Sequence, residues 1–510
     1  MTNQTTYHVP HPRTWRERMM RSYRMGGNMP LQYDWRYPRW LVGRSIVCFF
    51  ITMVACWLVF GYIPASDLVI VAGISVVLFF VLGRMMAVNW VRAGEKLFLQ
   101  RIFGVGFVIR LIWVLYMYFI FNPEYYGTTF GSTEDSVWFM GFAKDLAVWM
   151  QGGTYMSLAQ IIEINASAID DVGYPMWLAI EYMLTGGISD VFIPLLVKCM
   201  VSAYCAIGIY RVAKRHFGLG TARLAAIFVC INPNMIYWCS TMMKESEMVF
   251  VCCFAVDKLD EALSSGNKLT LRALLPGLLA VVYLFFMRTA LGLAFSLAIM
   301  AHLVFASQRV ISWGKKIVAG LLVVMVLFIG VGDRLFSQSE EYLEKIQSDA
   351  QQQNMEWRSN RVGGNDFAKY AGAAVFAPLI FTIPFPTFNS AEASQLLQVQ
   401  MAGGSFIKNI LSYFVVVVLV LLLITGEWRK HVFILVYTCA YLGVLVFSGY
   451  AQSGRFHMPI WPMLMLLAAY GVQIAKGNIH LRRGFTQILL IEFFVCLAWN
   501  WFKLKGRGMI

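Results

Sequence analysis

Two neighbouring acids, Glu134 and Asp135, follow the long apolar run 102–121 of this sequence. A carboxylate at the mouth of a membrane-embedded bundle packs poorly, but it can accept a proton from an attacking hydroxyl group. Asp135 is therefore our candidate general base, and Glu134 is expected to share that task or to orient a cation. The alternative is helix capping, in which Ser132 or Thr133 begins a helix and the two acids occupy its first turn.

A second acidic pair, Asp170 and Asp171, stands just before Gly173, Tyr174 and Pro175. These two aspartates and Tyr174 are candidates for binding a sugar hydroxyl or a cation. Paired carboxylates could hold Mg²⁺ or Mn²⁺, and they could equally act as a base and an orienting group without any metal. Ordinary turn chemistry, with Gly and Pro fixing the turn and the acids capping the next segment, explains the same residues without function.

Cations occur in three further segments that we expect at the same membrane face. Lys244 precedes Glu245, Arg288 lies between two apolar runs, and Arg455 and His457 precede another. A lipid phosphate that leaves in a reaction gains negative charge, which such cations would stabilise. These four basic residues are our candidate phosphate-binding groups, and Glu245 is a candidate for binding substrate or a cation. Alternatively, the basic side chains reach phospholipid heads and have no catalytic role.

The composition is that of a polytopic membrane protein. Of 510 residues, 59% are hydrophobic and 14% are charged, and the mean hydropathy is +0.62. The net charge of +14 is explained by basic loops that contact anionic lipid heads, so we expect membrane lipids and no nucleic acid as partners. The ten cysteines fall almost entirely in apolar runs and show neither metal-ligand spacing nor a disulfide framework.

Thirteen apolar runs, give or take two, are close to the length of a membrane span. Basic linkers predict that the N-terminus is cytoplasmic and that the long segments 122–189 and 333–406 lie outside. Within the first of these we expect amphipathic helices at 135–150 and 175–186. The runs are 41–63, 67–88, 102–121, 190–211, 220–237, 246–262, 273–287, 289–306, 316–332, 407–425, 431–448, 457–475 and 485–501.

These patterns predict an all-α membrane protein with a helical bundle of about 11–14 spans and outer-face juxtamembrane helices. An odd number of spans would place the basic C-terminal end outside, unless the last run is re-entrant or the count differs by one. The predicted units are a basic amphipathic cytoplasmic segment 1–40, an additional pair of spans 41–101, a catalytic core 102–332, an outer loop 333–406 acting as lid or acceptor groove, and C-terminal spans 407–510.

Lys198 stands inside the predicted span 190–211, and Glu492 stands deep in the last predicted span, 485–501. Charges at such positions are functional hypotheses by default. Lys198 is near enough to the outer end of its span for its ammonium to reach the membrane surface. Glu492 has no evident partner in the sequence, and a neutral, hydrogen-bonded glutamic acid is its simplest explanation.

Several motifs together resemble the GT-C superfamily of membrane glycosyltransferases, and in particular bacterial relatives of protein O-mannosyltransferases and of the aminoarabinose–lipid A transferase. Residues 135–143 are similar to the family's first-loop pattern Asp-Ser-x-x-Tyr-x-x-x-Ala, with Phe139 in the tyrosine position. The spans within 41–88 look like an addition to that pattern. The other matching stretches are 170–175, 210–218, 222–226, 232–233, 244–245, 455–462 and 466–471, so that the resemblance covers roughly 102–475.

The resemblance implies a sugar donor carried on a polyprenyl phosphate and a reaction on the extracytoplasmic face of the bacterial inner membrane. It implies that Asp135 deprotonates an acceptor hydroxyl, which attacks the anomeric carbon with inversion. The acceptor would be a glycan, a lipid or a protein, as in the synthesis of cell-envelope polysaccharides. A lipid-linked donor also agrees with the lack of a nucleotide-binding fold.

Two other functions fit the sequence. A polysaccharide polymerase or O-antigen ligase would use a polyprenyl-pyrophosphate-linked oligosaccharide, with Arg358 and Arg361 of the outer loop in its site. A flippase or transporter would need charges along a path through the membrane, for which only Lys198 and Glu492 qualify.

Overall fold

The computed structural model describes residues 37–61, 66–130, 134–154, 156–166, 169–185, 191–264, 270–305, 377–388, 400–448, 450–506, 508 and 510. In these ranges all regular structure is helical and no strand occurs. Eight helices of this part are long and apolar enough to cross a membrane. The predicted class, an all-α polytopic membrane protein, is confirmed.

The predicted apolar runs correspond to helices, except that 316–332 lies outside the described residues. Two helices, α13 (Leu271–Met287) and α14 (Thr289–Phe305), are shorter than the eight spans, and α12 (Glu245–Ser264) is interrupted by acids. The eight spans are α2 (Arg39–Phe60); α3 (Ser66–Val77) with η1 (Leu78–Leu82) and α4 (Gly83–Asn89); α5 (Glu95–Tyr116) with η2 (Met117–Phe121) and α6 (Asn122–Tyr126); α10 (Phe192–Cys230); α19 (Ala402–Thr425); η8 (Glu427–His431) with α20 (Val432–Phe447); α21 (Gly454–His457) with η9 (Met458–Ile460) and α22 (Trp461–Lys476); and α23 (Ile479–Lys505).

Helix α10 contains a sharp turn at Gly218, so that the two predicted runs 190–211 and 220–237 belong to its two limbs. Gly218 has a φ of 81°, a conformation that glycine adopts without steric penalty. The guanidinium of Arg110 donates to Ser202 Oγ on the first limb and to the carbonyl of Cys230 on the second, each at 2.8 Å. The limbs therefore lie side by side and lead back to the same end of the bundle.

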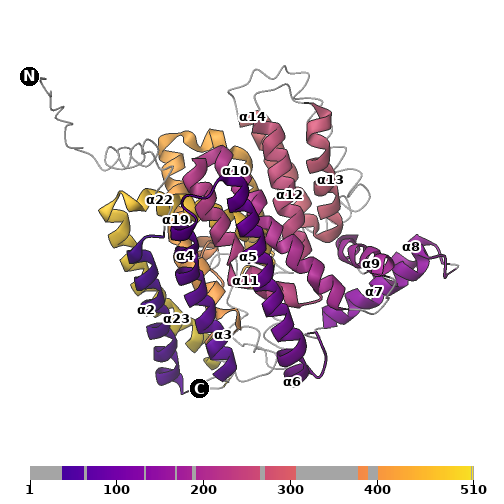
Figure 1. Cartoon of the computed structure of the whole chain (residues 1–510), viewed down its shortest axis with the longest axis horizontal. Helices are drawn as coiled ribbons and strands as arrows, with labels where there is room; N and C mark the ends of the chain where they lie inside the picture. The colour runs from indigo at the N-terminus through magenta and orange to yellow at the C-terminus, as the bar shows by residue number, and fades with distance from the viewer. Residues whose placement is uncertain are drawn as a thin grey trace, which may run out of the picture.

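The centre of the bundle is α22, whose predicted span is almost entirely buried and which packs against α10 and α19. On one side α12 packs against α10 and α13, and α14 packs against α13 and α20. On another side α2 contacts α23. Figure 1 shows these helices running roughly alongside one another, with the C-terminus at the end of the bundle where α6 lies. The last apolar run thus forms a continuous helix of 27 residues instead of a re-entrant turn.

Short helices carry the first acidic segments at the edge of the bundle (Figure 1). The predicted helices 135–150 and 175–186 are found as α7 (Glu134–Met150) and α9 (Gly173–Thr185), which pack against each other. Between them lie α8 (Leu158–Asn165) and η3 (Ile169–Asp171). The turns α11 (Pro233–Tyr237) and η4 (Trp238–Ser240) lead from α10 to α12. In the segment 377–388, only η6 (Ala377–Leu379) is helical.

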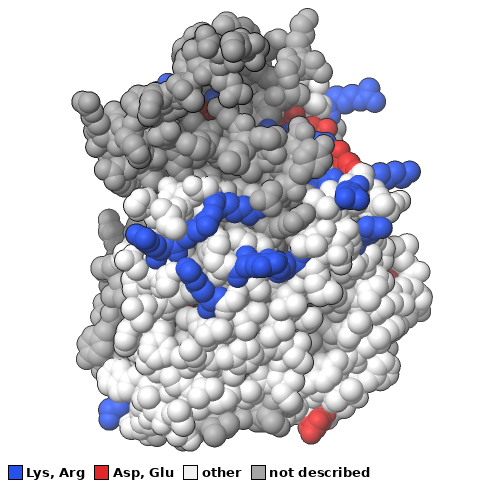
Figure 2. Space-filling view, turned by 60° about the vertical axis from the view of Figure 1, so that its left-hand side comes forward, with Lys and Arg blue, Asp and Glu red and all other residues white. Residues whose placement is uncertain are grey.

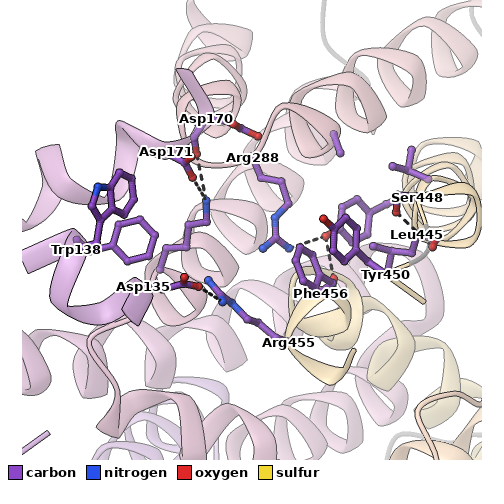
Figure 3. A pocket seen from close by; sticks show the side chains of 15 residues that line it. Asp135, Trp138, Asp170, Asp171, Arg288, Leu445, Ser448, Tyr450, Arg455 and Phe456 are labelled. Atoms are coloured by element: carbon purple, nitrogen blue, oxygen red, sulfur yellow. Dashed lines mark hydrogen bonds and ion pairs between the residues drawn. The ribbon is translucent and has the colours of Figure 1, made fainter. Parts of the chain in front are cut away.

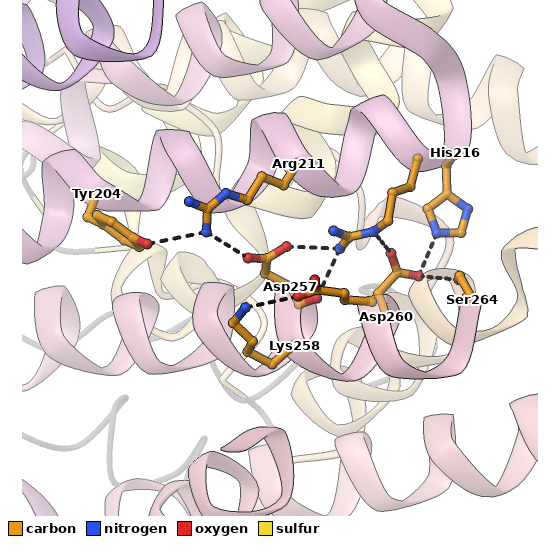
Figure 4. A network of polar contacts seen from close by, with 9 residues as sticks. Tyr204, Arg211, His216, Asp257, Lys258, Asp260 and Ser264 are labelled. Atoms are coloured by element: carbon orange, nitrogen blue, oxygen red, sulfur yellow. Dashed lines mark hydrogen bonds and ion pairs between the residues drawn. The ribbon is translucent and has the colours of Figure 1, made fainter. Parts of the chain in front are cut away.

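The opposite end of α12 carries a polar network (Figure 4). Arg215 donates to Asp257 at 2.9 Å and to Asp260 at 2.6 Å, and His216 bonds Asp260 at 2.6 Å. These contacts fix the turn at Gly218 against the last part of α12. The basic linker 211–215, which contains Arg215, therefore lies at the other end of α12 from Glu245.

Figure 2 shows lysines and arginines gathered in a band across one face of the molecule, above a broad area without charge.

Lys198 and Glu492 are both buried within the bundle. Lys198 has no exposed side-chain surface and pairs with Glu247 at 2.7 Å. The expectation that its ammonium reaches the membrane surface is wrong, because an anion on α12 binds it within the bundle. Glu492 accepts a hydrogen bond from Asn409 Nδ2 at 3.0 Å, the kind of partner that the sequence did not reveal.

Candidate functional site

A cavity of about 500 Å³ opens where the short helices meet the bundle. It combines side chains from segments far apart in the sequence, and most of the predicted site residues line it (Figure 3). The lining residues are Asp135, Trp138 and Phe139 of α7; Asp170 and Asp171 of η3; Lys244; Arg288 and Ala290; Tyr441, Val444 and Leu445 of α20; and Ser448, Tyr450, Arg455 and Phe456.

Arg455 joins two carboxylates at the cavity. Its Nη1 donates to Asp135 Oδ2 and its Nε donates to Glu245 Oε1, each at 2.5 Å. The side chain of Asp135 is 53% exposed, whereas that of Glu245 is fully buried. Asp135 is thus the accessible carboxylate of the pair, and Glu245 supports the guanidinium from below.

Arg288 stands beside the same buried anion, with Nη2 4.0 Å from Glu245 Oε1. Its Nη1 donates to the Tyr441 hydroxyl at 3.0 Å, and its guanidinium lies 4.4 Å from the ring centroid of Phe456. The Tyr441 hydroxyl donates to the carbonyl of Phe456 at 2.8 Å. Two arginines are therefore fixed next to each other around one glutamate, an arrangement that can receive a further anion.

Lys244 provides the third cation of the cavity. Its Nζ donates to Asp171 Oδ1 at 3.3 Å and to the carbonyl of Asp170 at 3.2 Å. Burial, and then the neighbouring Arg288, lower the pKa of Lys244 from its ordinary value. The contact with Asp171 opposes this shift, so the aspartate helps to keep the ammonium charged.

The second acidic pair is held by tight packing at the start of α9. Asp170 Oδ2 accepts from the backbone N–H of Thr289 at 3.4 Å, and the Tyr283 hydroxyl donates to the carbonyl of Gly173 at 2.8 Å. A Cβ at Gly173 would lie 2.7 Å from the backbone oxygen of Phe286. Only glycine allows this approach, which brings the aspartates to the junction of α13 and α14.

One wall of the cavity is apolar. Ala290 of α14 and Val444 and Leu445 of α20 face the same space as the cations. On the other side, Trp138 lines the cavity while its Nε1 donates to the carbonyl of Asn165 at 3.0 Å. The cavity can thus accept a ligand that carries both an anionic group and an apolar chain.

Three predicted site residues do not line the cavity. Glu245 lies beneath it. His457 is fully buried, with Nε2 2.6 Å from the carbonyl of Ala451 and Nδ1 3.1 Å from Lys408. Tyr174 is also buried and packs edge-on against Phe139. Because neither side chain reaches the cavity, the structure does not support His457 or Tyr174 as a substrate ligand.

Glu134 begins α7, and its side chain is outside the described part of the structure. Arg358 and Arg361, on which the polymerase or ligase hypothesis depends, are outside it as well. Sequence reasoning missed Tyr441, which lies within an apolar run without any distinguishing pattern. It also missed Phe456, although this residue stands inside the motif that contains Arg455.

Within the described residues, no three His, Cys, Asp or Glu side chains are grouped so that they could hold a metal ion. Asp170 and Asp171 each bind a donor of the protein instead. This part of the structure offers no ready cation site. A requirement for Mg²⁺ or Mn²⁺ stays a prediction, which activity with and without a chelator would test.

The fold and the cavity define a polytopic membrane protein with a polar site at one end of its bundle. The model of the Alg9-like mannosyltransferase family matches residues 153–337. This match confirms the resemblance to GT-C glycosyltransferases, and the chain is a membrane glycosyltransferase that uses a lipid-linked sugar. The chain matches no curated protein and no solved structure. The matched range contains Asp170, Asp171, Lys244 and Arg288, whereas Asp135 and Arg455 lie outside it.

Proposed function

We propose that this glycosyltransferase moves a sugar from a polyprenyl-phosphate donor to a hydroxyl group of a glycan, lipid or protein. The reaction takes place on the extracytoplasmic face of a bacterial inner membrane. The single observation that carries the proposal is the convergence of three cations, one accessible carboxylate and an apolar wall on one cavity of about 500 Å³.

The cations account for recognition of the donor phosphate. Arg288 and Arg455 stand together around Glu245, and Lys244 faces the same cavity. As the bond between the sugar and the phosphate breaks, its electron pair goes to the phosphate oxygen. Fixed cations stabilise that developing charge more than they stabilise the intact donor, which is what catalysis requires.

Asp135 serves as the general base. The acceptor hydroxyl oxygen attacks the anomeric carbon, and its proton goes to the carboxylate of Asp135. Because attack and departure occur on opposite sides of the sugar ring in one step, the anomeric configuration inverts. Asp135 suits this task because it lines the cavity and because more than half of its side chain is accessible.

The apolar wall suits the polyprenyl chain. Ala290, Val444 and Leu445 belong to the apolar helices α14 and α20, so the first isoprene units can lie along them while the phosphate reaches the arginines. The extracytoplasmic placement is supported by the basic network at the other end of α12, because basic residues accumulate on the cytoplasmic side of membrane proteins.

Purified protein in detergent, supplied with polyprenyl-phosphate-linked sugars and a crude pool of acceptors, tests the proposal. The family name makes mannose the first sugar to try. We expect acceptor-dependent release of polyprenyl phosphate. Consumption of a pyrophosphate-linked oligosaccharide, with no release from any monophosphate donor, would instead support a polymerase or ligase. Movement of a lipid-linked sugar across proteoliposomes without transfer would support a flippase.

A further inference from the structure

Lys198 is a buried cation near the site that the proposed mechanism does not use. Its Nζ donates to the carbonyl of Met243 at 2.6 Å and to Glu247 Oε2 at 2.7 Å. The same ammonium lies 4.6 Å from the ring centroid of Tyr174. Neither Lys198 nor Glu247 lines the cavity, and neither has exposed side-chain surface.

Two of the contacts lie beside residues that line the cavity. Met243 immediately precedes Lys244, and Tyr174 follows Asp171 by three positions. Lys244 and Asp171 both line the cavity and pair with each other at 3.3 Å. Lys198 therefore contacts the backbone beside one member of this pair and the helix that begins beside the other.

The segment from Thr241 to Lys244 lies between η4 and α12, and the helical hydrogen bonding of α12 begins only at its end, where the carbonyl of Lys244 accepts from the N–H of Met248 at 2.9 Å. All four of its residues are nevertheless buried. A buried segment without regular structure needs specific partners for its carbonyl groups. Lys198 is such a partner for the carbonyl of Met243. The charge of Lys198 is balanced by Glu247 on the first turn of α12. Burying an ion pair inside a membrane bundle costs desolvation free energy. The presence of this pair therefore points to a function beyond packing.

We propose that Lys198, held by Glu247, is a positioning residue that fixes Lys244 for binding the donor phosphate. The inference rests on the proposed function, because it assigns Lys244 to the phosphate. Lys198 does not touch the substrate. It acts through the backbone of Met243 and through the packing of Tyr174.

The paired substitution Lys198→Met with Glu247→Met tests this assignment, because it removes both buried charges and leaves none uncompensated. We expect the KM for the donor to rise about tenfold and kcat to fall as well, because Lys244 binds both the intact donor and the departing phosphate. In a Lys244→Met background the same pair should have no further effect. Equal effects in both backgrounds would overturn the inference, because Lys198 would then not act through Lys244.

Hydrogen exchange measured by mass spectrometry gives a second readout that needs no activity. The amides of 241–246 should exchange about tenfold faster in the paired variant, and those of α23 should be unchanged. The matched control is Lys214→Met with Glu95→Met, which removes an exposed pair of the same 2.7 Å length from the same helix α10. This control should alter neither the exchange of 241–246 nor the donor KM.

The two readouts separate failure of the inference from failure of the proposed function. If the wild type transfers no sugar from any polyprenyl phosphate, the proposed function fails, and exchange of 241–246 still decides whether Lys198 positions this segment. If transfer occurs but the paired variant keeps both the donor KM and the protection, the inference fails alone. Should the paired variant not fold, Glu247→Gln decides, because Lys198 then loses the anion that holds it. The amides of 241–246 should exchange faster than in the wild type while those of α23 stay unchanged, and wild-type protection of 241–246 would overturn the assignment.

Discussion

Arg455 and Asp135 are hydrogen-bonded at 2.5 Å although 320 positions separate them in the chain. The contact joins helix α7 to α21, the short helix that precedes η9 and α22. It also brings the candidate base, Asp135, into contact with Arg455, a cation that we assign to binding the donor phosphate. A bound phosphate would compete with Asp135 for this guanidinium, and the carboxylate would then be available to an acceptor hydroxyl.

The two-sided contact of Arg455 predicts that lysine cannot replace it. Nε and Nη1 reach Glu245 and Asp135 at the same time, and a single ammonium lacks this forked geometry. We expect Arg455→Lys to lower kcat/KM for the donor by roughly 10- to 100-fold. Arg483→Lys, at an exposed position of α23, is the control and should have wild-type kinetics. Full activity of Arg455→Lys would exclude bidentate use of this arginine.

Glu245 should stabilise the protein as well as the site. In Glu245→Gln two neighbouring arginines lose their shared anion, and we expect the free energy of unfolding to fall by about 2 kcal/mol. This is less than the ~3–5 kcal/mol of a fully buried pair, because Arg455 still reaches solvent. Thermal melting in detergent measures the change. Glu261→Gln, which breaks the exposed pair with Lys258, should shift melting very little. Equal melting of the two variants would contradict the structural role of Glu245.

The sequence predicted the residues that converge on the cavity better than it predicted what each contacts. Asp135, Lys244, Arg288 and Arg455 could be proposed because charged residues beside apolar runs are rarely accidental. The contacts that these residues make with one another could not be predicted, since they depend on helices that meet only in the folded bundle.

Side-chain direction was the main source of error. His457 is two residues after Arg455, yet it points into the bundle toward Lys408. Lys198 was expected to reach the membrane surface because it stands near the outer end of its predicted span. Its actual partner, Glu247, is 49 positions away and on another helix. The turn at Gly218 was foreseen only as a gap between two spans. Its tight geometry follows from a single positive φ angle, which periodicity does not reveal.

The close approach at Gly173 predicts strong sensitivity to an added methyl group. In Gly173→Ala the new Cβ would meet the backbone oxygen of Phe286 at 2.7 Å, and a backbone atom cannot move as easily as a side chain. We expect a loss of about 1–3 kcal/mol in stability, together with weaker donor binding as the Asp170–Asp171 turn shifts. Gly141→Ala in α7 is the matched control, because its Cβ would meet nothing within 4 Å. Unchanged melting of Gly173→Ala would show that α9 and α13 are less tightly packed.

Glu181 predicts a pH dependence of stability. Burial, and next the nearby Glu247, raise the pKa of this α9 residue to about 8. Between the unfolded value of about 4.3 and this folded value, the folded protein retains a proton that the unfolded chain has lost. Stability therefore falls as the pH rises through this window, by on the order of a few kcal/mol in total, and levels off above it.

Melting temperatures from pH 5 to 9 test this dependence. Glu181→Gln cannot ionise and still offers an oxygen to Trp177 Nε1, which donates to Glu181 at 2.6 Å. The variant should lack this part of the pH dependence and should melt at a higher temperature than the wild type at pH 8. Parallel melting curves for the two proteins would show that Glu181 is ionised in the folded state.

The most direct measurement is the turnover of Asp135→Asn at saturating donor, compared with wild type and with Asp145→Asn. Asp145 lies on the same helix α7 and bonds Asn165 away from the cavity, so its variant controls for the change of charge. We expect Asp135→Asn to lose about 100-fold or more in kcat, in the range of a lost general base, while binding the donor and melting like the wild type. Asp145→Asn should retain normal turnover. Wild-type turnover by Asp135→Asn would exclude Asp135 as the general base, because another group would then remove the acceptor proton.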